Sequence, residues 1–161
     1  MFDWNQIFGR KQRKTDGNLN QRQKRMFEKR ERNLSQPEWN RLKRKLLNIG
    51  GKAVVPPTDP EETPESFLNG MLNKGQVINL SVEVKNMKSS DCHKNSAKLW
   101  KEENADISTG FSLSEDGLWR LHSWAVKNRK IIETTVPREI YYGVVLTGKS
   151  NKLFAESEGV V

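Results

Sequence analysis

Three residues in the second half of the chain, Cys92, His122 and Glu133, are of the types that nucleophilic acyl chemistry uses: a thiol, an imidazole and a carboxylate. Cys92 is the only cysteine, which excludes an intrachain disulfide. Residues 89–91 (Ser-Ser-Asp) favour capping and predict a helix over residues 92–102 that begins at the cysteine. The amino end of a helix stabilises a thiolate, which is the nucleophilic form of cysteine.

His122 and Glu133 lie in two consecutive β-rich segments. We expect residues 119–126 and 130–136 to pair as a hairpin whose turn lies at 127–130. The two residue numbers differ by an odd number, so the side chains can share one face of that hairpin. A carboxylate beside a histidine fixes the tautomer of the ring and stabilises the imidazolium, which can hold a thiolate as an ion pair.

Each of these residues also has a purely structural explanation. A free cysteine is among the most buried residue types, His122 fits a core histidine with satisfied polar atoms, and Glu133 inside a strand needs a partner if it is buried. His93 is expected at the surface or simply beside the site. The predicted helix start at Cys92, together with the downstream histidine and acid, favours a site over these alternatives.

The same segments resemble the transglutaminase-like branch of the papain-like cysteine hydrolases. The stretches His122-Ser-Trp-Ala-Val and Ile131-Ile-Glu-Thr-Thr135 resemble its histidine and acid strands, and Asp91-Cys-His-Lys-Asn-Ser-Ala97 is similar to its cysteine-bearing helix start. The stretches Thr109-Gly-Phe-Ser-Leu113 and Tyr141-Tyr-Gly143 resemble strands of small bacterial and phage relatives. The resemblance covers residues 76–147.

The resemblance implies a helix that carries the cysteine, packed on an antiparallel sheet that carries the histidine and the acid. It implies Cys92 as nucleophile, His122 as general base and then acid, and Glu133 as the residue that orients the histidine. Asn95 and Trp124 are support residues at most, and tryptophans in such strands more often belong to the core than to a substrate wall.

The sequence departs from the family pattern at the acid. Glu133 stands where the family usually has aspartate, so its longer side chain needs a slightly different spacing, and Thr134 stands where proline usually follows. No oxyanion-hole side chain is identified, although backbone N–H groups at the helix start can serve. The family's substrate is not carried over. No metal or other cofactor is expected, because CxxC, HExxH and Gly-rich phosphate motifs are missing.

The order of elements predicts an α+β fold: an antiparallel sheet packed on the cysteine-bearing helix, preceded by a basic helical amino-terminal arm. Alternating apolar residues predict a strand over 76–87, and the β-rich segments from 107 onward read as an antiparallel meander. We divide the chain into a basic arm (1–52), a proline-rich linker with a short helix (53–75) and an α+β domain (76–161).

Within the arm, the spacing of Ser35 and Glu38 is that of a capping box, and apolar residues at helical spacing predict a helix over 36–48. Residues 10–33 fit either a long, mostly polar helix with little to bury or a segment that is partly disordered in isolation. Residues 1–9 carry apolar side chains that pack on the same domain or form a docking helix or tag.

The arm concentrates the positive charge of the chain. Residues 1–52 hold 15 Lys and Arg against 5 Asp and Glu, whereas the remainder holds 13 against 15. This imbalance favours nucleic acid or another polyanion as partner, with an acidic protein or a solvated surface as alternatives. The predicted contact residues are Arg22, Lys24, Arg25, Arg30, Arg41, Lys43, Arg44 and Lys45.

The chain has no run of 18 apolar residues and no apolar leader near its start, so neither a membrane span nor a secretory signal is expected. We expect a cytoplasmic protein. The leading hypothesis is a cysteine hydrolase or acyltransferase that acts on an amide or thioester, with a protein or peptide as a possible substrate. The alternative is a non-enzymatic protein that binds nucleic acid or protein on an inactive scaffold of the same kind.

Overall fold

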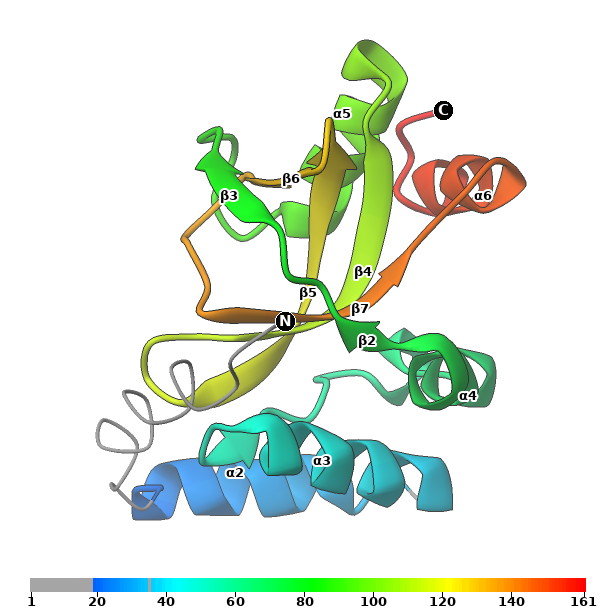
Figure 1. The fold of residues 1–161 in the computed structure, drawn as a ribbon. Coiled ribbons are helices and arrows are strands. Elements are labelled where there is room, and N and C mark those ends of the chain that lie inside the picture. Colours follow the sequence, from blue (N-terminus) through cyan, green and yellow to red (C-terminus); the bar gives the residue numbers. More distant parts are fainter. Residues whose placement is uncertain (1–18, 35) are drawn as a thin grey trace. The chain divides into compact units, whose positions relative to one another are not determined.

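Helices and a β-sheet are both present in the computed structural model, which describes residues 19–34 and 36–161 and has the predicted α+β class (Figure 1). The described residues form two units. The first unit comprises the described residues up to Lys74 together with Leu113–Arg120, and the second comprises Gly75–Ser112 and Leu121–Val161. The apolar stretch predicted over residues 1–9, and residues 10–18 of the predicted polar helix, lie outside the described part of the chain.

The first unit is mainly helical. Its elements are α2 (Gln21–Glu31), α3 (Pro37–Ile49), β1 (Ala53–Val54), the short 3₁₀ helix η1 (Pro60–Glu62), α4 (Glu65–Lys74) and the beginning of β5. Trp39, Leu42 and Leu46 repeat at helical spacing on α3, and all three are buried. Burial of this stripe explains why a helix so rich in lysine and arginine folds.

The helix predicted over 36–48 is confirmed, but its first turn differs from the expectation. The N-cap is Gln36, whose side chain makes no capping hydrogen bond, and Ser35 lies outside the described residues. The capping box belongs to α2 instead, where Asn20 Oδ1 accepts from Gln23 N at 2.8 Å and Gln23 Oε1 accepts from Asn20 N at 3.2 Å. Two reciprocal bonds satisfy backbone donors that a helix start leaves unpaired.

The proline-rich segment is held by strand pairing. β1 pairs in parallel with the beginning of β5, in the register Ala53 with Leu118 and Val54 with Trp119. The indole Nε1 of Trp119 donates to Gly50 O at 2.9 Å. These contacts tie the chain that follows α3 to the 113–120 stretch, which is why two sequence-distant segments form one unit.

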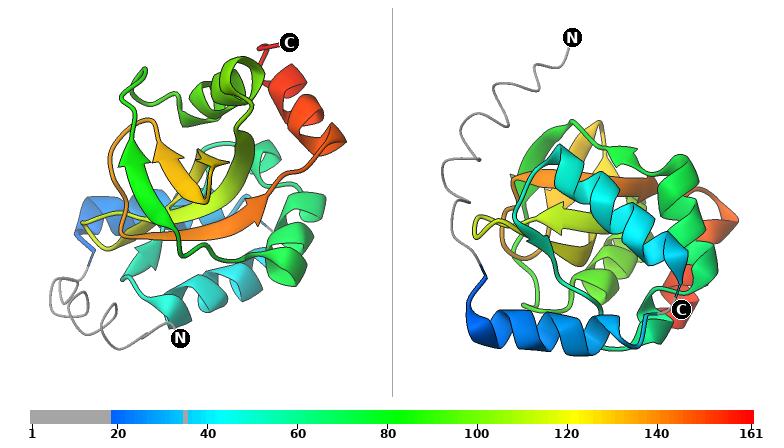
Figure 2. Two further views of the ribbon diagram at one scale, coloured as in Figure 1. Left: turned by 45° about the horizontal axis from the view of Figure 1, so that its top comes forward. Right: turned by 90° about the horizontal axis from the view of Figure 1, so that it is seen from below.

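The second unit contains the sheet. Its elements are β2 (Gln76–Val77), β3 (Ser81–Val84), α5 (Cys92–Glu103), β4 (Asp106–Leu113), the remainder of β5 (Leu118–Lys127), β6 (Lys130–Glu133), β7 (Ile140–Val145) and α6 (Lys149–Ser157). The strand order is β2-β7-β4-β5-β6-β3, and the sheet curls strongly (Figure 2). Leu99 of α5 packs with Ala125 and Ile132 of the sheet.

Two features of the sheet differ from the predicted meander. The single strand expected over 76–87 is split into β2, which pairs with β7, and β3, which joins β6 in parallel at the other end of the sheet. The residues between them, Ile78 and Leu80, pack on an aromatic cluster instead of continuing the strand.

The second difference is that β7 lies next to β4 and not next to β6. Gly110 and Gly143 make this neighbourhood possible. A Cβ atom on Gly143 would collide with Thr109 O, and one on Gly110 would collide with Tyr142 O. Glycine permits such close backbone approach within a sheet.

Among the residues that the structure describes, no helix is both long and apolar enough to cross a membrane.

Candidate active site

Cys92 is the first residue of α5, as predicted, and its side chain is partly exposed. Asp91 occupies the N-cap position, but its side chain makes no capping hydrogen bond; the capping predicted for the Ser-Ser-Asp run is wrong in this respect. The helix begins through backbone geometry, with Asn95 N donating to Asp91 O at 2.9 Å. The first-turn N–H groups therefore receive no capping hydrogen bond from the Asp91 side chain.

His122 lies on β5 and joins the thiol to the acid. Its Nε2 lies 2.7 Å from Oε1 of Glu133, and the Cys92 side chain lies close enough to its ring to influence the pKa of His122. Because Nε2 faces the carboxylate, Nδ1 is the nitrogen left for the sulfur. Burial alone would lower the pKa of His122, but the interactions with Cys92 and Glu133 outweigh it and raise that pKa above its ordinary value.

Glu133 ends β6 and is fully buried, with 0% of its surface exposed. Its Oε2 accepts from the backbone N of Thr135 at 3.0 Å and from Thr135 Oγ1 at 3.1 Å. Its Oε1 accepts from Tyr141 OH at 2.9 Å, and Arg138 Nε lies 4.0 Å away. Burial raises the pKa of Glu133, yet the hydrogen bonds and the charge of His122 lower it below its ordinary value.

The hairpin register explains how the acid reaches the histidine. Ala125 pairs with Ile132 and Val126 with Ile131, so Glu133 stands opposite Trp124 and diagonal to His122. All three side chains are on one face, because opposed residues share a face and so do residues two apart on one strand. A glutamate is long enough to span the diagonal, which accounts for the departure from aspartate.

An aromatic cluster packs against the imidazole. Trp124 stacks on His122 at 6.0 Å between ring centroids, and Tyr141 meets Trp124 edge-on at 4.9 Å. Both are buried. The predicted support residue Trp124 therefore fixes the ring plane of His122 by packing, as part of the core.

Asn95, the other predicted support residue, connects α5 to the acid strand. Its buried Nδ2 donates to Lys88 O at 2.7 Å and to Thr134 Oγ1 at 3.3 Å. Thr134 is the residue after Glu133. The amide therefore couples the helix that carries the nucleophile to the strand that carries the acid.

His93 is partly buried and lies beside the site, which is one of the two positions expected for it. Its Nδ1 lies 2.6 Å from Ser123 Oγ, which donates in turn to Thr109 Oγ1 at 3.0 Å. Burial, followed by the charge of His122, lowers the pKa of His93. It is thus a neutral histidine that anchors the first turn of α5 to the residue after His122.

Sequence reasoning assigned no role to Tyr141, Thr135, Ser123 or Arg138. Thr135 had a local signal, because a threonine two residues after an acid commonly forms a side-chain turn. Tyr141 lies in a stretch that resembles a family strand, but its hydroxyl reaches Glu133 only because β7 lies next to β4 in the sheet. Ser123 and Arg138 carried no signal.

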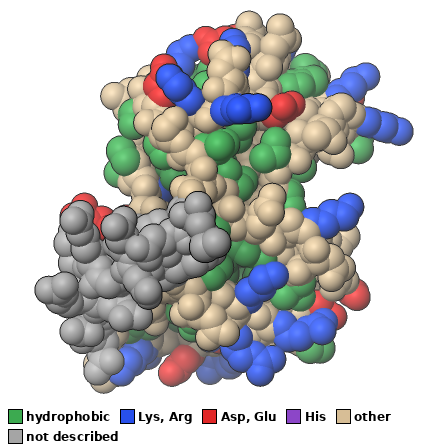
Figure 3. Space-filling view, in the orientation of Figure 1, with side chains coloured by type: hydrophobic (Ala, Val, Ile, Leu, Met, Phe, Trp, Pro, Cys, Tyr) green, Lys and Arg blue, Asp and Glu red, His purple; other side chains and the backbone are tan. Residues whose placement is uncertain are grey.

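The predicted basic residues separate into two groups. Arg22, Lys24, Arg25, Arg41, Arg44 and Lys45 are exposed. Arg30 donates to Pro56 O at 3.2 Å and Lys43 donates to Glu31 at 2.7 Å, so both stabilise the first unit. Lys and Arg side chains gather over α2 and α3 in Figure 3.

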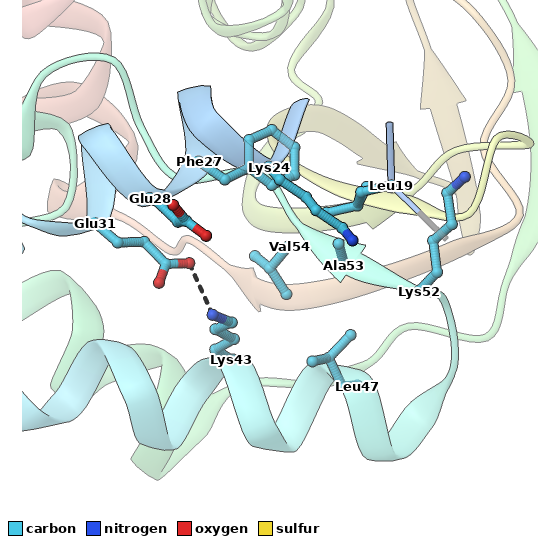
Figure 4. A pocket seen from close by; sticks show the side chains of 10 residues that line it. All are labelled: Leu19, Lys24, Phe27, Glu28, Glu31, Lys43, Leu47, Lys52, Ala53 and Val54. Atoms are coloured by element: carbon cyan, nitrogen blue, oxygen red, sulfur yellow. Dashed lines mark hydrogen bonds and ion pairs between the residues drawn. The ribbon is translucent and has the colours of Figure 1, made fainter. Parts of the chain in front are cut away.

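The first unit also contains a cavity of about 240 Å³, which α2 and α3 flank with β1 between them (Figure 4). Its apolar lining comes from Leu19, Phe27, Leu47, Ala53 and Val54, and its polar lining from Lys24, Glu28, Glu31, Lys43 and Lys52. The Lys43–Glu31 ion pair lies across it. The cavity shares no residue with the cysteine site.

Within residues 19–34 and 36–161, no cluster of three or more His, Cys, Asp or Glu side chains is arranged to hold a metal ion. The arrangement of thiol, imidazole and carboxylate is one that supports nucleophilic acyl transfer. No protein-family model, no curated protein and no solved structure matches this chain.

Proposed function

We propose that this protein is a cysteine-dependent hydrolase or acyltransferase that acts on an amide or thioester bond, as the transglutaminase-like resemblance implies. One observation carries the proposal: Cys92 lies beside His122, and His122 is hydrogen-bonded to Glu133, with a partly exposed thiol at one end of the series and a fully buried carboxylate at the other. A substrate can reach the sulfur, while the groups that activate it are kept away from water.

In the first step, His122 holds the proton of the thiol, and the thiolate of Cys92 attacks the carbonyl carbon. A C–S bond forms and the carbonyl oxygen becomes an oxyanion, which backbone N–H groups at the start of α5 can stabilise. The oxyanion collapses and the C–N or C–S bond of the substrate breaks. The leaving amine or thiol takes the proton from the imidazolium.

In the second step, water or an acceptor amine attacks the acyl-enzyme. Neutral His122 takes a proton from the attacking group, the C–S bond to Cys92 breaks, and the sulfur leaves as a thiolate beside the imidazolium. Water gives a carboxylic acid and an amine gives a new amide. Neither route needs an oxidant, a reductant or a metal ion.

Glu133 has an electrostatic and an orienting role in this scheme. It accepts from Thr135 and Tyr141 as well as from His122. These donors stabilise its ionised form inside the protein, and the ionised form stabilises the imidazolium in both steps. The carboxylate is not required to take up a proton.

The experiment is alkylation of Cys92 by iodoacetamide as a function of pH, in the wild type and in His122→Ala. We expect the wild-type thiol to react readily at neutral pH and the variant to react at least about tenfold more slowly there, because the imidazolium no longer stabilises the thiolate. The control is Glu103→Gln, a change outside the site at a carboxylate that bonds Lys85, which is expected to react like the wild type. Equal rates in the wild type and in His122→Ala would exclude the proposed dyad.

A second candidate function, polyanion binding, is favoured by the exposed faces of the two basic helices. Arg22, Arg25 and Lys29 recur at intervals of three and four on α2, and none has an acidic partner among the described residues. Arg41, Arg44 and Lys45 are also exposed on α3, where Arg41 lies 3.6 Å from Glu38 and Lys45 donates to Leu72 O at 3.2 Å. Exposed basic helix faces of this kind can bind the phosphate groups of a nucleic acid, and such binding releases the counterions that the phosphates hold.

Binding of a fluorescein-labelled DNA duplex at several salt concentrations tests this candidate. We expect affinity to fall steeply with salt and to fall further in an Arg22→Gln/Arg25→Gln variant, with a shallower salt slope. Cys92→Ala is the control and is expected to bind like the wild type. An affinity for DNA that changes neither with salt concentration nor with replacement of the two arginines would contradict this candidate function.

A further inference from the structure

β3 is the last strand of the sheet. It pairs with β6 along its whole length, from Ser81 with Lys130 to Val84 with Glu133, and no described strand pairs with its other side. Sheet edges of this kind carry backbone N–H and C=O groups that another strand can pair with.

The backbone of β3 alternates in direction. Lys85 N donates to Glu133 O at 2.8 Å, so the backbone of Lys85 and of residues two apart from it, such as Glu83, faces β6. In a parallel pair the intervening residues face away from the partner. Val82 and Val84 therefore present their N–H and C=O groups outward.

The side chains of the same two residues are apolar and exposed. Val82 is 42% and Val84 44% exposed. Native sheet edges are usually protected by charged side chains, proline or a covering element. An edge whose outward-facing residues are valines is the kind that pairs with an extended chain.

This edge leads directly to the candidate site. Val84 is the register partner of Glu133 in β6. After β3 the chain runs beside Glu133 and Thr134, because Lys85 N donates to Glu133 O and Met87 N donates to Thr134 O. The chain then enters α5 at Cys92. A strand added to β3 would be aligned with the path toward the sulfur.

The other end of the edge is basic. Ser81 pairs with Lys130, which closes the β5–β6 turn together with Arg129. Both basic residues are exposed, and neither has an ion-pair partner in the described part of the chain. An acidic residue on a ligand would be favoured at this end.

We propose that β3 is the substrate-docking edge of this protein, and that its ligand is a polypeptide in extended conformation. The ligand adds a strand to the sheet, places apolar side chains beside Val82 and Val84, and carries an acidic residue toward Arg129 and Lys130. The role of this ligand as substrate rests on the proposed cysteine chemistry, whereas the docking itself does not.

The test uses the full chain with Cys92→Ala, which cannot form an acyl-enzyme. The probe is a fluorescein-labelled peptide with valine at alternate positions and aspartate at one end, followed by fluorescence anisotropy. Its control peptide has the same side chains with alternate backbone nitrogens methylated, which prevents strand pairing. We expect the first peptide to bind and to slow hydrogen exchange at the Val82 and Val84 amides, and the second to bind at least about tenfold more weakly.

Val84→Pro in the same background removes one outward N–H and leaves the bonds to β6, because proline is tolerated at an edge where its nitrogen faces solvent. We expect the affinity for the peptide to fall at least about tenfold, because one backbone hydrogen bond to the peptide is lost and the adjacent ones are weakened. The Lys85 amide, which donates to Glu133, reports whether β3 is still paired. Val145→Thr, a change at an exposed valine on β7, is expected to bind normally.

The proposed docking edge would be overturned if Val84→Pro bound the peptide with unchanged affinity while the Lys85 amide stayed protected from hydrogen exchange. It would also be overturned if the peptide slowed exchange at amides elsewhere and not at Val82 and Val84. Sedimentation showing that Val84→Pro converts a dimer into a monomer would overturn it as well, because β3 would then pair two copies of the chain. Failure of the proposed chemistry looks different: Cys92 of the wild type would be inert to alkylation while the Cys92→Ala protein still bound the peptide through β3.

Discussion

Oε1 of Glu133 receives two donors at once: Nε2 of His122 at 2.7 Å and the hydroxyl of Tyr141 at 2.9 Å. The two donors come from β5 and β7, which are not neighbours in the sheet. The acid is therefore held between two separate strands. This arrangement makes the charge state of His122 depend on residues that do not touch the thiol.

Glu133→Gln tests the charge of the acid. The amide keeps the shape of the side chain but cannot stabilise an imidazolium, so we expect the pKa of His122 to fall when measured by NMR titration of the ring. Alkylation of Cys92 at neutral pH should slow at least about tenfold, since the imidazolium that holds the thiolate is depopulated. Glu103→Gln, a change at an exposed carboxylate bonded to Lys85, is the control; an equal effect there would contradict the assignment.

Tyr141→Phe tests the second donor. The ring and its edge-on contact with Trp124 are retained, and only the hydroxyl is lost. A hydrogen bond to a charged group contributes about 1.5–3 kcal/mol, so we expect a loss of that order in the free energy of unfolding measured with urea. The pKa of Glu133 should rise at the same time. The neighbouring change Tyr142→Phe is the comparison, and an unchanged Glu133 titration in Tyr141→Phe would refute the role.

The shifts of His122 and Glu133 set a pH window for stability. The His122 pKa is raised, so its contribution is complete below the ordinary value of 6.5 and is lost as pH rises through the folded-state pKa. The Glu133 pKa is lowered, so its contribution is complete above the ordinary value of 4.5 and is lost as pH falls through the folded-state pKa.

Urea unfolding of the wild type and His122→Gln across pH measures this window. We expect the difference in unfolding free energy to be largest between pH 4.5 and 6.5 and to shrink on the alkaline side. A difference that grows as pH rises would mean that the folded protein prefers neutral His122.

Gly143→Ala and Gly70→Ala form a matched pair that tests the β4–β7 approach. At Gly143 a methyl group collides with backbone of Thr109, whereas nothing lies within 4 Å of it at Gly70 in α4. We expect Gly143→Ala to cost several kcal/mol, at least about 3, because backbone atoms must move. Gly70→Ala should be neutral or stabilise by about 0.5–1 kcal/mol, as alanine does within a helix. Thermal unfolding distinguishes the two.

Much of the local structure follows from the sequence alone. The apolar stripe of Trp39, Leu42 and Leu46 predicted α3, the Ser-Ser-Asp run placed Cys92 at a helix start, and the turn at 127–130 set the β5–β6 hairpin. In each case the signal lies within a few residues, because helix periodicity, turn chemistry and hairpin register are short-range properties. The same hairpin register placed His122 and Glu133 on one face.

Only the tertiary structure decided the rest. The split of the strand predicted over 76–87, the position of β7 beside β4, and the delivery of Tyr141 to Glu133 all depend on which strand edges meet, and strand-edge pairing joins residues far apart in sequence. The exposed edge at Val82 and Val84 likewise exists because β3 ends the sheet. Sequence periodicity determines that a segment is a strand and which way its side chains alternate, but the partner of a strand is chosen by long-range packing, such as the glycine pair that lets β4 and β7 approach.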